Sequence, residues 1–428
     1  ISKRLADSGM VDFLNVIRGR IHTDPAMTDI IPVQGMKSAP HLDFAGEVKK
    51  ATGMPTFHAA RIPDVATARH AVSEGLLDMV GMTRAHMADP HIVRKIMEGR
   101  EDDIRPCVGA TYCLDRIYQA GDALCIHNAA TGRELTMPHD IPPAKTRRKV
   151  VVIGAGPGGL EAARVAGERG HDVTVFEAAA APGGQVRLTA RNPRRAEMIG
   201  IIDWRMAQCA VRDVEFRFNT WAEAEDVLAL DPEVVIVATG GMPGTELFET
   251  RGEAANAVSA WDIISGDVKP AAHVLIYDES GDHPGLMAAE TAAKAGSKVE
   301  VMTPDRTFAP EVMGMNLVPY MRALQDKDVS FTVARRLLGT ERCGNRLLAA
   351  IGTDYSGHSY QAEYDQVVVN YGTVPLDDLY FALKEHSMNR GEMDYDALIA
   401  GRPQEIAANP EGRFQLFRIG DAVSARNT

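Results

Sequence analysis

Three of the five cysteines in this chain crowd into one short window of the sequence. Cys107, Cys113 and Cys125 stand in the segment RPCVGATYCLDRIYQAGDALCIHN with the spacing C-x5-C-x11-C. Five cysteines in 428 residues are too few for a disulfide scaffold, and such clustering is typical of a metal centre. Thiolates are soft ligands that lose their protons when a metal binds, so the window predicts an iron–sulfur cluster. Three buried structural thiols are the alternative.

A four-iron cubane normally takes four thiolates, and this window supplies three. The sequence therefore does not identify the fourth ligand. A four-iron cluster with an open or non-cysteine fourth ligand, a three-iron cluster and the loss of the cluster all agree with three cysteines. Asp115, His127 or solvent could fill the fourth place. We expect the four-iron form (4Fe-4S).

The strongest signal in the chain is a glycine-rich turn between an apolar run and a helix. Gly154, Gly156 and Gly159 follow the run Val150 to Ile153, and Glu177 ends the next apolar run, VTVFE. The glycines permit a tight turn and let the backbone approach a pyrophosphate at the helix N-terminus, while the acid can accept from a ribose hydroxyl. This spacing predicts a bound dinucleotide.

Three later motifs extend that pattern. They are GGQ with Gly183, Gly184 and Gln185, the run VVIVATG with Ala238 and Gly240, and FRIGDA with Gly420 and Asp421. Each alone would be only a loop of small residues. In this order they resemble the pattern of two-dinucleotide-domain flavoproteins, in which the late Gly-Asp pair closes over FAD. The resemblance implies FAD, or ADP in its place, as the ligand.

A second Rossmann-like unit begins at the run HVLIYD and departs from this pattern. Its turn reads ESGDHPG (residues 279–285), so acids and a proline fill the early glycine positions. A carboxylate beside the pyrophosphate position repels a dinucleotide, and a proline removes a backbone donor. We therefore expect nicotinamide binding to be disfavoured there, with electrons leaving to another carrier.

The elements that would hold a further cofactor precede the cysteines. The apolar runs FLNVI, MPTFHAARI and LLDMVGMTRA alternate with amphipathic segments such as Val65 to Glu74. This β/α repetition fits a parallel barrel or a doubly wound sheet, but three strands cannot close a barrel. Because the chain starts at Ile1 inside a helix-like segment, we infer an upstream portion that holds the other barrel strands.

The expected fold class is α/β: the C-terminal part of a barrel, a cysteine loop and two Rossmann-like units. The prolines of the linker MPHDIPPAKTRR predict a domain boundary near residue 145. The expected divisions are 1–100 (barrel), 101–145 (cysteine loop and linker), 146–265 (first Rossmann-like unit), 266–375 (second Rossmann-like unit) and 376–428 (return to the first).

Composition and charge restrict the partners. Apolar residues make up 45% of the chain and charged residues 24%, which is ordinary for a soluble globular protein. A formal net charge of -12 repels nucleic-acid phosphates and anionic lipid, and no run of lysine and arginine offsets it. No stretch approaches the roughly 20 apolar residues that a membrane-spanning helix needs. We expect a cytoplasmic protein that binds neither nucleic acid nor membrane.

The cysteine window is similar to the cluster loop of the trimethylamine dehydrogenase and 2,4-dienoyl-CoA reductase family, with Ala110 where the family has its second cysteine. PTFHAARIPD and DMVGMTRAHMADP resemble the last two strands and loops of the family's old yellow enzyme-like (β/α)8 barrel. The resemblance, which covers nearly the whole chain, implies bound FMN. Its phosphate would be held by Arg61, Gly81, Met82, Thr83 and Arg84.

Candidate catalytic residues come from the segment DFLNVIRGRIHTDPAM. They are Arg18, Arg20, His22 and Asp24. In the family, amine oxidation occurs at the flavin beside an aromatic pocket that holds a cation. Since arginine forks bind carboxylates and repel a bare ammonium, we hypothesise a substrate with both an N-methyl amine and a carboxylate, such as an N-methyl amino acid. Solvated arginines are the alternative.

The resemblance implies an oxidoreductase that demethylates a methylated amine or N-methyl amino acid and releases formaldehyde. Electrons would pass from FMN through the cluster to FAD and then to an electron-transferring flavoprotein. We expect a homo-oligomer. An enoyl reductase that takes electrons from NAD(P)H is one alternative. A non-catalytic electron-transfer or nucleotide-binding module is another.

Overall fold

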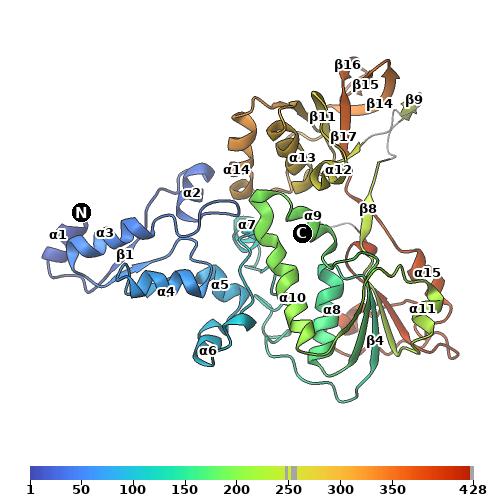
Figure 1. Ribbon diagram of the computed structural model, residues 1–428, viewed down its shortest axis with the longest axis horizontal. Coiled ribbons are helices and arrows are strands. Elements are labelled where there is room, and N and C mark those ends of the chain that lie inside the picture. Colours follow the sequence, from blue (N-terminus) through green and yellow to red (C-terminus); the bar gives the residue numbers. More distant parts are fainter. Residues whose placement is uncertain (246–248, 252–257, 425–428) are drawn as a thin grey trace. The chain divides into compact units, whose positions relative to one another are not determined.

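The computed structural model describes residues 1–245, 249–251 and 258–424, and the chain divides into two compact units (Figure 1). The N-terminal unit comprises Ile1–Met137 and Gly314–Pro319, and the C-terminal unit comprises Pro138–Met313 and Tyr320–Thr428. The break after Met137 lies at the start of the proline-rich segment MPHDIPPAKTRR, where prolines prevent both helix and central strand. The finer division into five ranges stays a prediction.

The N-terminal unit contains a parallel sheet of three short strands, β1 (Leu14–Val16), β2 (Thr56–His58) and β3 (Met79–Val80), in that order. Helices follow each strand, as the β/α repetition predicts. The helices are α1 (Ser2–Asp7), α2 (Asp24–Ile30), α3 (Leu42–Thr52), α4 (Val65–Ser73), α5 (Thr83–Ala88), α6 (Ile92–Met97), the 3-10 turn η1 (Glu101–Asp103) and α7 (Tyr112–Tyr118).

Capping residues and a small apolar core explain where these helices begin. Asp64 Oδ1 accepts a hydrogen bond from the backbone N–H of Thr67 at 2.7 Å, which satisfies a free donor at the start of α4. Thr23 does the same for α2. The core beneath the sheet is formed by Val16, Leu42, Ala45, Ile62, Ala71 and Leu77. Because the three strands are parallel, their carboxyl ends all lie at the same edge of the sheet.

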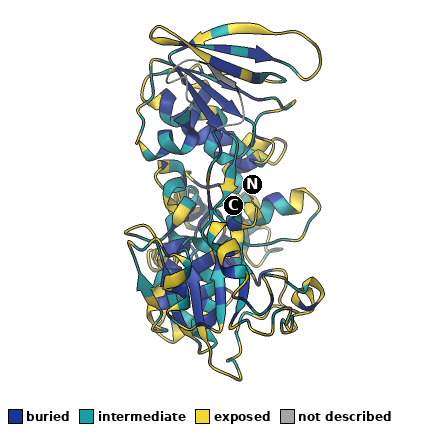
Figure 2. Cartoon of the chain, turned by 90° about the vertical axis from the view of Figure 1, so that its right-hand side faces the viewer, coloured by how far each residue is buried: buried dark blue, intermediate teal, exposed yellow. Residues whose placement is uncertain are grey.

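The C-terminal unit begins with a five-stranded parallel sheet in the order β19-β7-β4-β5-β6, here called the first Rossmann sheet. Its strands are β4 (Lys149–Ile153), β5 (Asp172–Phe176), β6 (Glu215–Arg217), β7 (Val234–Val237) and β19 (Gln415–Arg418). The surrounding helices are α8 (Pro157–Glu168), α9 (Gly184–Thr189), η2 (Pro193–Ile199), α10 (Gly200–Ala210), α11 (Ala224–Leu228), α15 (Asp378–Lys384), α16 (Tyr395–Ile399) and η3 (Gly420–Ala422). Val150 to Ile153 of β4 are apolar and buried, as is typical of a parallel strand that is covered on both faces, and Figure 2 draws buried residues in dark blue.

A second five-stranded parallel sheet, the second Rossmann sheet, has the order β10-β17-β11-β12-β13. Its strands are β10 (Val258–Ser259), β11 (His273–Asp278), β12 (Lys298–Met302), β13 (Ser330–Thr332) and β17 (Gln366–Asn370), with helices α12 (Ala260–Ser265), α13 (His283–Lys294) and α14 (Gly314–Gln325). Smaller sheets are formed by β14 (Arg336–Cys343), β15 (Arg346–Gly352), β16 (Tyr360–Tyr364) and β9 (Glu249–Arg251), and by β8 (Gly241–Pro243) with β18 (Thr373–Pro375). Among the described helices, none has the length and apolar character needed to cross a bilayer.

Candidate nucleotide and thiol sites

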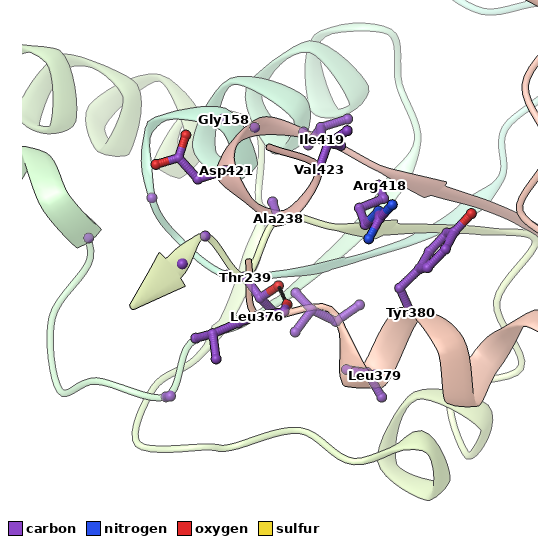
Figure 3. A pocket seen from close by; sticks show the side chains of 18 of the residues that line it. Gly158, Ala238, Thr239, Leu376, Leu379, Tyr380, Arg418, Ile419, Asp421 and Val423 are labelled. Atoms are coloured by element: carbon purple, nitrogen blue, oxygen red, sulfur yellow. Dashed lines mark hydrogen bonds between the residues drawn. The ribbon is translucent and has the colours of Figure 1, made fainter. Parts of the chain in front are cut away.

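One candidate site is a cavity of about 1220 Å³ at the carboxyl ends of the strands of the first Rossmann sheet (Figure 3). Ligands of open parallel sheets bind at this edge, outside the strand ends. Nine of the predicted FAD residues line it: Gly154, Gly156, Glu177, Gly184, Gln185, Ala238, Gly240, Gly420 and Asp421. The structure thus brings together positions that span most of the chain.

The turn after β4 shows what glycine contributes at three places. Gly154 has a φ of +101°, in the left-handed region that side chains avoid. A Cβ on Gly159 would lie 1.9 Å from the carbonyl oxygen of Gly154, so the third glycine lets α8 pack against the turn. A Cβ on Gly156 would meet nothing within 4 Å, which leaves open space at the N-terminus of α8. An anion is favoured in that space, since backbone N–H groups point into it.

Glu177 lies directly after β5 and is hydrogen bonded on both carboxylate oxygens. Oε2 accepts from the backbone N–H of Ala155 at 2.7 Å, and Oε1 accepts from that of Ala179 at 2.8 Å. The side chain therefore fastens the glycine turn to the end of the neighbouring strand. Each oxygen has a second lone pair, so the carboxylate can still accept from a ribose hydroxyl.

Two of the three later motifs, GGQ and FRIGDA, meet through one side-chain contact. Gln185 Nε2, in the first turn of α9, donates to Asp421 Oδ2 in η3 at 2.7 Å, although the two residues lie 236 positions apart. Gly183 precedes α9 with a φ of +129°, and its N–H donates to the carbonyl of Ala155 at 2.8 Å. Gly183 and Gly159 therefore shape the cavity without lining it.

Several residues of the cavity wall were not predicted from the sequence. Trp221 and Trp261 line it, as do Arg418 and Tyr380. The guanidinium carbon of Arg418 lies 4.5 Å from the centre of the Tyr380 ring, and the two side chains are adjacent in Figure 3. Arg418 also forms an ion pair with Asp377. Trp221, Trp261 and Tyr380 stand outside any glycine motif, so no local pattern marks them. Arg418 lies within FRIGDA, but the motif gives no role to this position.

The three clustered cysteines of the N-terminal unit line one small cavity. Cys107, Cys113 and Cys125 share its wall with Ala110 and with the ring of His127. Burial raises the pKa of the Cys113 thiol to about 11 and raises that of Cys125 as well. In the described parts of the chain, no group of three or more His, Cys, Asp or Glu residues is arranged to hold a metal ion. The thiols therefore do not form a ready site for a single ion.

The candidates for a fourth ligand differ in where they point. Asp115 Oδ2 accepts from Asn316 Nδ2 at 3.1 Å, and this carboxylate does not line the thiol cavity. The same Asn316 amide donates to the carbonyl of Ala110 at 2.9 Å. His127 lines the cavity while its Nδ1 contacts the carbonyl of Pro106 at 2.9 Å. Ala110 itself offers no ligand atom on its side chain.

The predicted FMN phosphate residues fall into two places. Arg61 and Gly81 follow β2 and β3, at the shared carboxyl edge of the sheet, and Met82 and Thr83 begin α5. Arg84 lies instead on the wall of the thiol cavity, with Nη2 donating to the carbonyl of Pro32 at 2.9 Å. Its positive charge favours the thiolate of Cys113. A phosphate contact from Arg84 stays a prediction.

The candidate catalytic residues follow β1 and are all exposed. The guanidinium carbon of Arg18 lies 4.9 Å from the ring centre of Phe44. Asp24 is in the first turn of α2, where its Oδ2 would be 2.8 Å from a Cβ added at Gly314. Arg20 and His22 lie in the loop between them. The described structure shows no contact that draws these four side chains together.

This chain is similar to one known protein family and to several individual proteins. The family model for pyridine nucleotide-disulphide oxidoreductases matches residues 148–400. A probable N-methylproline demethylase of Rhizobium meliloti (strain 1021) is 68% identical over 428 residues, which are 100% of this chain and 63% of that protein. An N,N-dimethylglycine/sarcosine dehydrogenase of Chromohalobacter salexigens is 42% identical over 432 residues, covering 98% of this chain and 62% of that protein.

The solved structure of a 2-naphthoyl-CoA reductase complex superposes with a TM-score of 0.83 at 26% identity, covering 100% of this chain and 59% of that one. The chain thus spans less than two thirds of the length of these relatives. The expected family resemblance and the oxidoreductase class are confirmed. The chain belongs to the pyridine nucleotide-disulphide oxidoreductase family, as a flavoprotein related to trimethylamine dehydrogenase.

Proposed function

We propose that this chain is the electron-transfer part of a flavin-dependent enzyme that oxidatively demethylates an N-methyl compound. The observation that carries the flavin assignment is the cavity on the first Rossmann sheet. Its volume of about 1220 Å³ exceeds the range of roughly 300–1,000 Å³ usual for drug-sized ligands, as an elongated dinucleotide requires. The relatives named as an N-methylproline demethylase and as a dimethylglycine/sarcosine dehydrogenase support the substrate class.

FAD, or ADP in its place, is the ligand that we assign to this cavity. Bound FAD would accept and release electrons singly or in pairs. The backbone at Gly154 and Gly156 would hold the pyrophosphate at the start of α8, and Glu177 would accept from the ribose. Gln185 and Asp421 close the cavity from α9 and η3 through their mutual hydrogen bond.

An iron–sulfur cluster held by Cys107, Cys113 and Cys125 is the second group that we propose. The donor set fits, because the three thiols share one cavity wall with the half-buried Arg84. Arg84 Nη1 is buried and has no hydrogen-bond partner among the described residues. A cluster with thiolate ligands carries negative charge, so it would give this guanidinium nitrogen a partner. The bound cluster would supply one-electron transfer.

The substrate end of the reaction would lie in a barrel to which β1, β2 and β3 contribute. Arg61 and the backbone of Gly81 to Thr83 would hold an FMN phosphate at the shared carboxyl edge. Arg18 and Arg20 would bind a carboxylate on the substrate, as their exposure allows. The N-methyl carbon would lose two electrons, and water would then release formaldehyde and the demethylated amine. An electron-transferring flavoprotein is the acceptor that we propose.

The test is a cofactor and substrate analysis of the full-length protein. Acid release should yield FMN and FAD, and anaerobic addition of an N-methyl amino acid should bleach the flavin absorbance without added nicotinamide. Bleaching by trimethylamine but not by N-methyl amino acids would refute the carboxylate hypothesis. Nucleotide without flavin would instead support a binding module. Reduction of the flavin by NAD(P)H would support the enoyl reductase.

A further inference from the structure

The two Rossmann sheets can be aligned through the helix that follows the first strand of each. α8 after β4 and α13 after β11 are both 12 residues long. Gly156 is the residue that precedes α8, and Asp282 is the residue that precedes α13. Gly159-Leu160 and Gly285-Leu286 stand three residues further on. Ser280, Asp282 and Gly285 are therefore the counterparts of Gly154, Gly156 and Gly159.

The space before the helix is open in the first sheet and filled in the second. A Cβ on Gly156 would meet nothing within 4 Å, and this space belongs to the nucleotide cavity. Asp282 places a carboxylate at the equivalent position, where its Oδ1 accepts from Asn370 Nδ2 at 2.7 Å. A side chain of this chain thus stands where a dinucleotide would present its phosphates.

A second carboxylate reaches the same point from the end of β11. Asp278 is 2% exposed, and its Oδ1 accepts from the Asn370 amide and from the backbone N–H of Gly281, each at 2.9 Å. Its Oδ2 would be 2.5 Å from a Cβ added at Gly285. Gly285 therefore leaves room for a carboxylate, whereas Gly159 leaves room for a backbone carbonyl.

A positive charge from within the protein lies near Asp282. Arg195, on η2, is 5% exposed, and it interacts electrostatically with Asp282 and hydrogen bonds to Tyr320. Burial and the neighbouring Asp282 raise the pKa of Asp278 above its ordinary value. Next to Arg195, the Arg194 guanidinium forms an ion pair with Glu290 of α13 at 2.6 Å. These contacts fix η2 against α13.

We propose that Asp278 and Asp282 occupy the phosphate position of the second Rossmann sheet, so that this sheet accepts no nicotinamide dinucleotide as electron donor or acceptor. A pyrophosphate placed there would meet two carboxyl groups at the helix N-terminus, where like charges repel strongly in a buried site. It would also have to displace the hydrogen bonds of Asn370, and unpaired buried polar groups are costly. The inference rests on the proposed function only for the statement that electrons leave by another route.

The test is a binding titration of NADH and NADPH by fluorescence on the resting holoprotein, with excess ADP to keep the first cavity occupied. Wild-type protein should show no saturation below roughly 1 mM. The variant Ser280→Gly/Asp282→Gly, which recreates G-x-G-x-x-G with Gly285, should bind at least about ten-fold more tightly, a change of roughly 1.4 kcal/mol. Ser280→Ala/Asp282→Ala is the matched control, since it removes the charge of Asp282 but keeps a Cβ at both positions.

Saturation of the wild-type protein at micromolar NADH or NADPH would overturn the proposal, as would equal affinities of the wild type and the folded glycine variant. If the glycine variant does not fold, Asp278→Asn/Asp282→Asn replaces it. This variant removes both charges with little change of shape, and it should also bind more tightly than the wild type. Because binding is measured without turnover, a failed demethylase assay would leave this result intact.

Discussion

The nucleotide cavity of the C-terminal unit and the thiol cavity of the N-terminal unit are built in opposite ways. The first is shaped mainly by backbone, with Gly154 in a left-handed conformation and Gly159 against a carbonyl oxygen. The second is defined by three sulfur atoms, two on loops and that of Cys113 in α7, and Asn316 holds this region through the Ala110 carbonyl. A backbone site tolerates no added atoms at its tightest contacts, whereas a side-chain site depends on which atoms each residue supplies.

The largest expected effect comes from filling the tightest backbone contact. Gly159→Val should abolish nucleotide retention and lower the free energy of unfolding by about 3 kcal/mol or more, because its Cβ would lie 1.9 Å from the Gly154 oxygen. Nucleotide content after purification and a urea melt measure both effects. Gly158→Ala is the control, since its Cβ would meet only the Ile419 side chain at 3.8 Å. Normal nucleotide content in Gly159→Val would refute the steric argument.

Removal of one thiol should affect the other site alone. Cys125→Ser should lose most of its iron and acid-labile sulfide while its nucleotide content stays unchanged, because a hydroxyl is a poor replacement for a soft thiolate. Cys343→Ser, at an exposed cysteine outside the cavity, is the matched control. Anaerobic iron and sulfide assays provide the measurement. If wild-type protein contains no iron at all, the proposed cluster does not exist.

Addition of a thiol tests the missing ligand. Ala110→Cys should slow the loss of iron in air several-fold, because a fourth thiolate would cover the iron that three cysteines leave open. Electron paramagnetic resonance should then show less of any three-iron signal. Ala110→Ser is the control for size. Identical iron loss in all three proteins would mean that the position of Ala110 does not face the cluster.

The smallest effect is expected from the exposed aromatic wall of the nucleotide cavity. Trp221 is 70% exposed and follows Thr220, whose N–H donates to the carbonyl of Glu177 at 2.9 Å. Stacking of a base on an aromatic ring contributes about 1–3 kcal/mol, and the exposure favours the lower value. Trp221→Ala should weaken ADP binding about five-fold in calorimetry. Tyr355→Ala, at another exposed aromatic outside the cavity, should not change it.

The sequence alone was sufficient for features that depend on local geometry. The glycine turn before α8 is visible because its strand, its spacing and its helix must all be continuous in the chain. The β/α repetition before residue 100 and the proline-rich linker are local for the same reason. The cysteine window showed which ligand atoms are present, since thiol chemistry is a property of the residue itself.

Only the tertiary structure decided which distant side chains meet. Arg84 lies on the wall of the thiol cavity, and Gln185 donates a hydrogen bond to Asp421, which follows it by 236 positions in the sequence. Asp278 and Asp282 share one amide of Asn370, which follows them by almost a hundred residues. Such contacts depend on strand order and helix packing, which no local pattern of residues specifies. Hydrogen bonds between buried side chains are therefore determined by the folded chain, although the residues that make them are already present in the sequence.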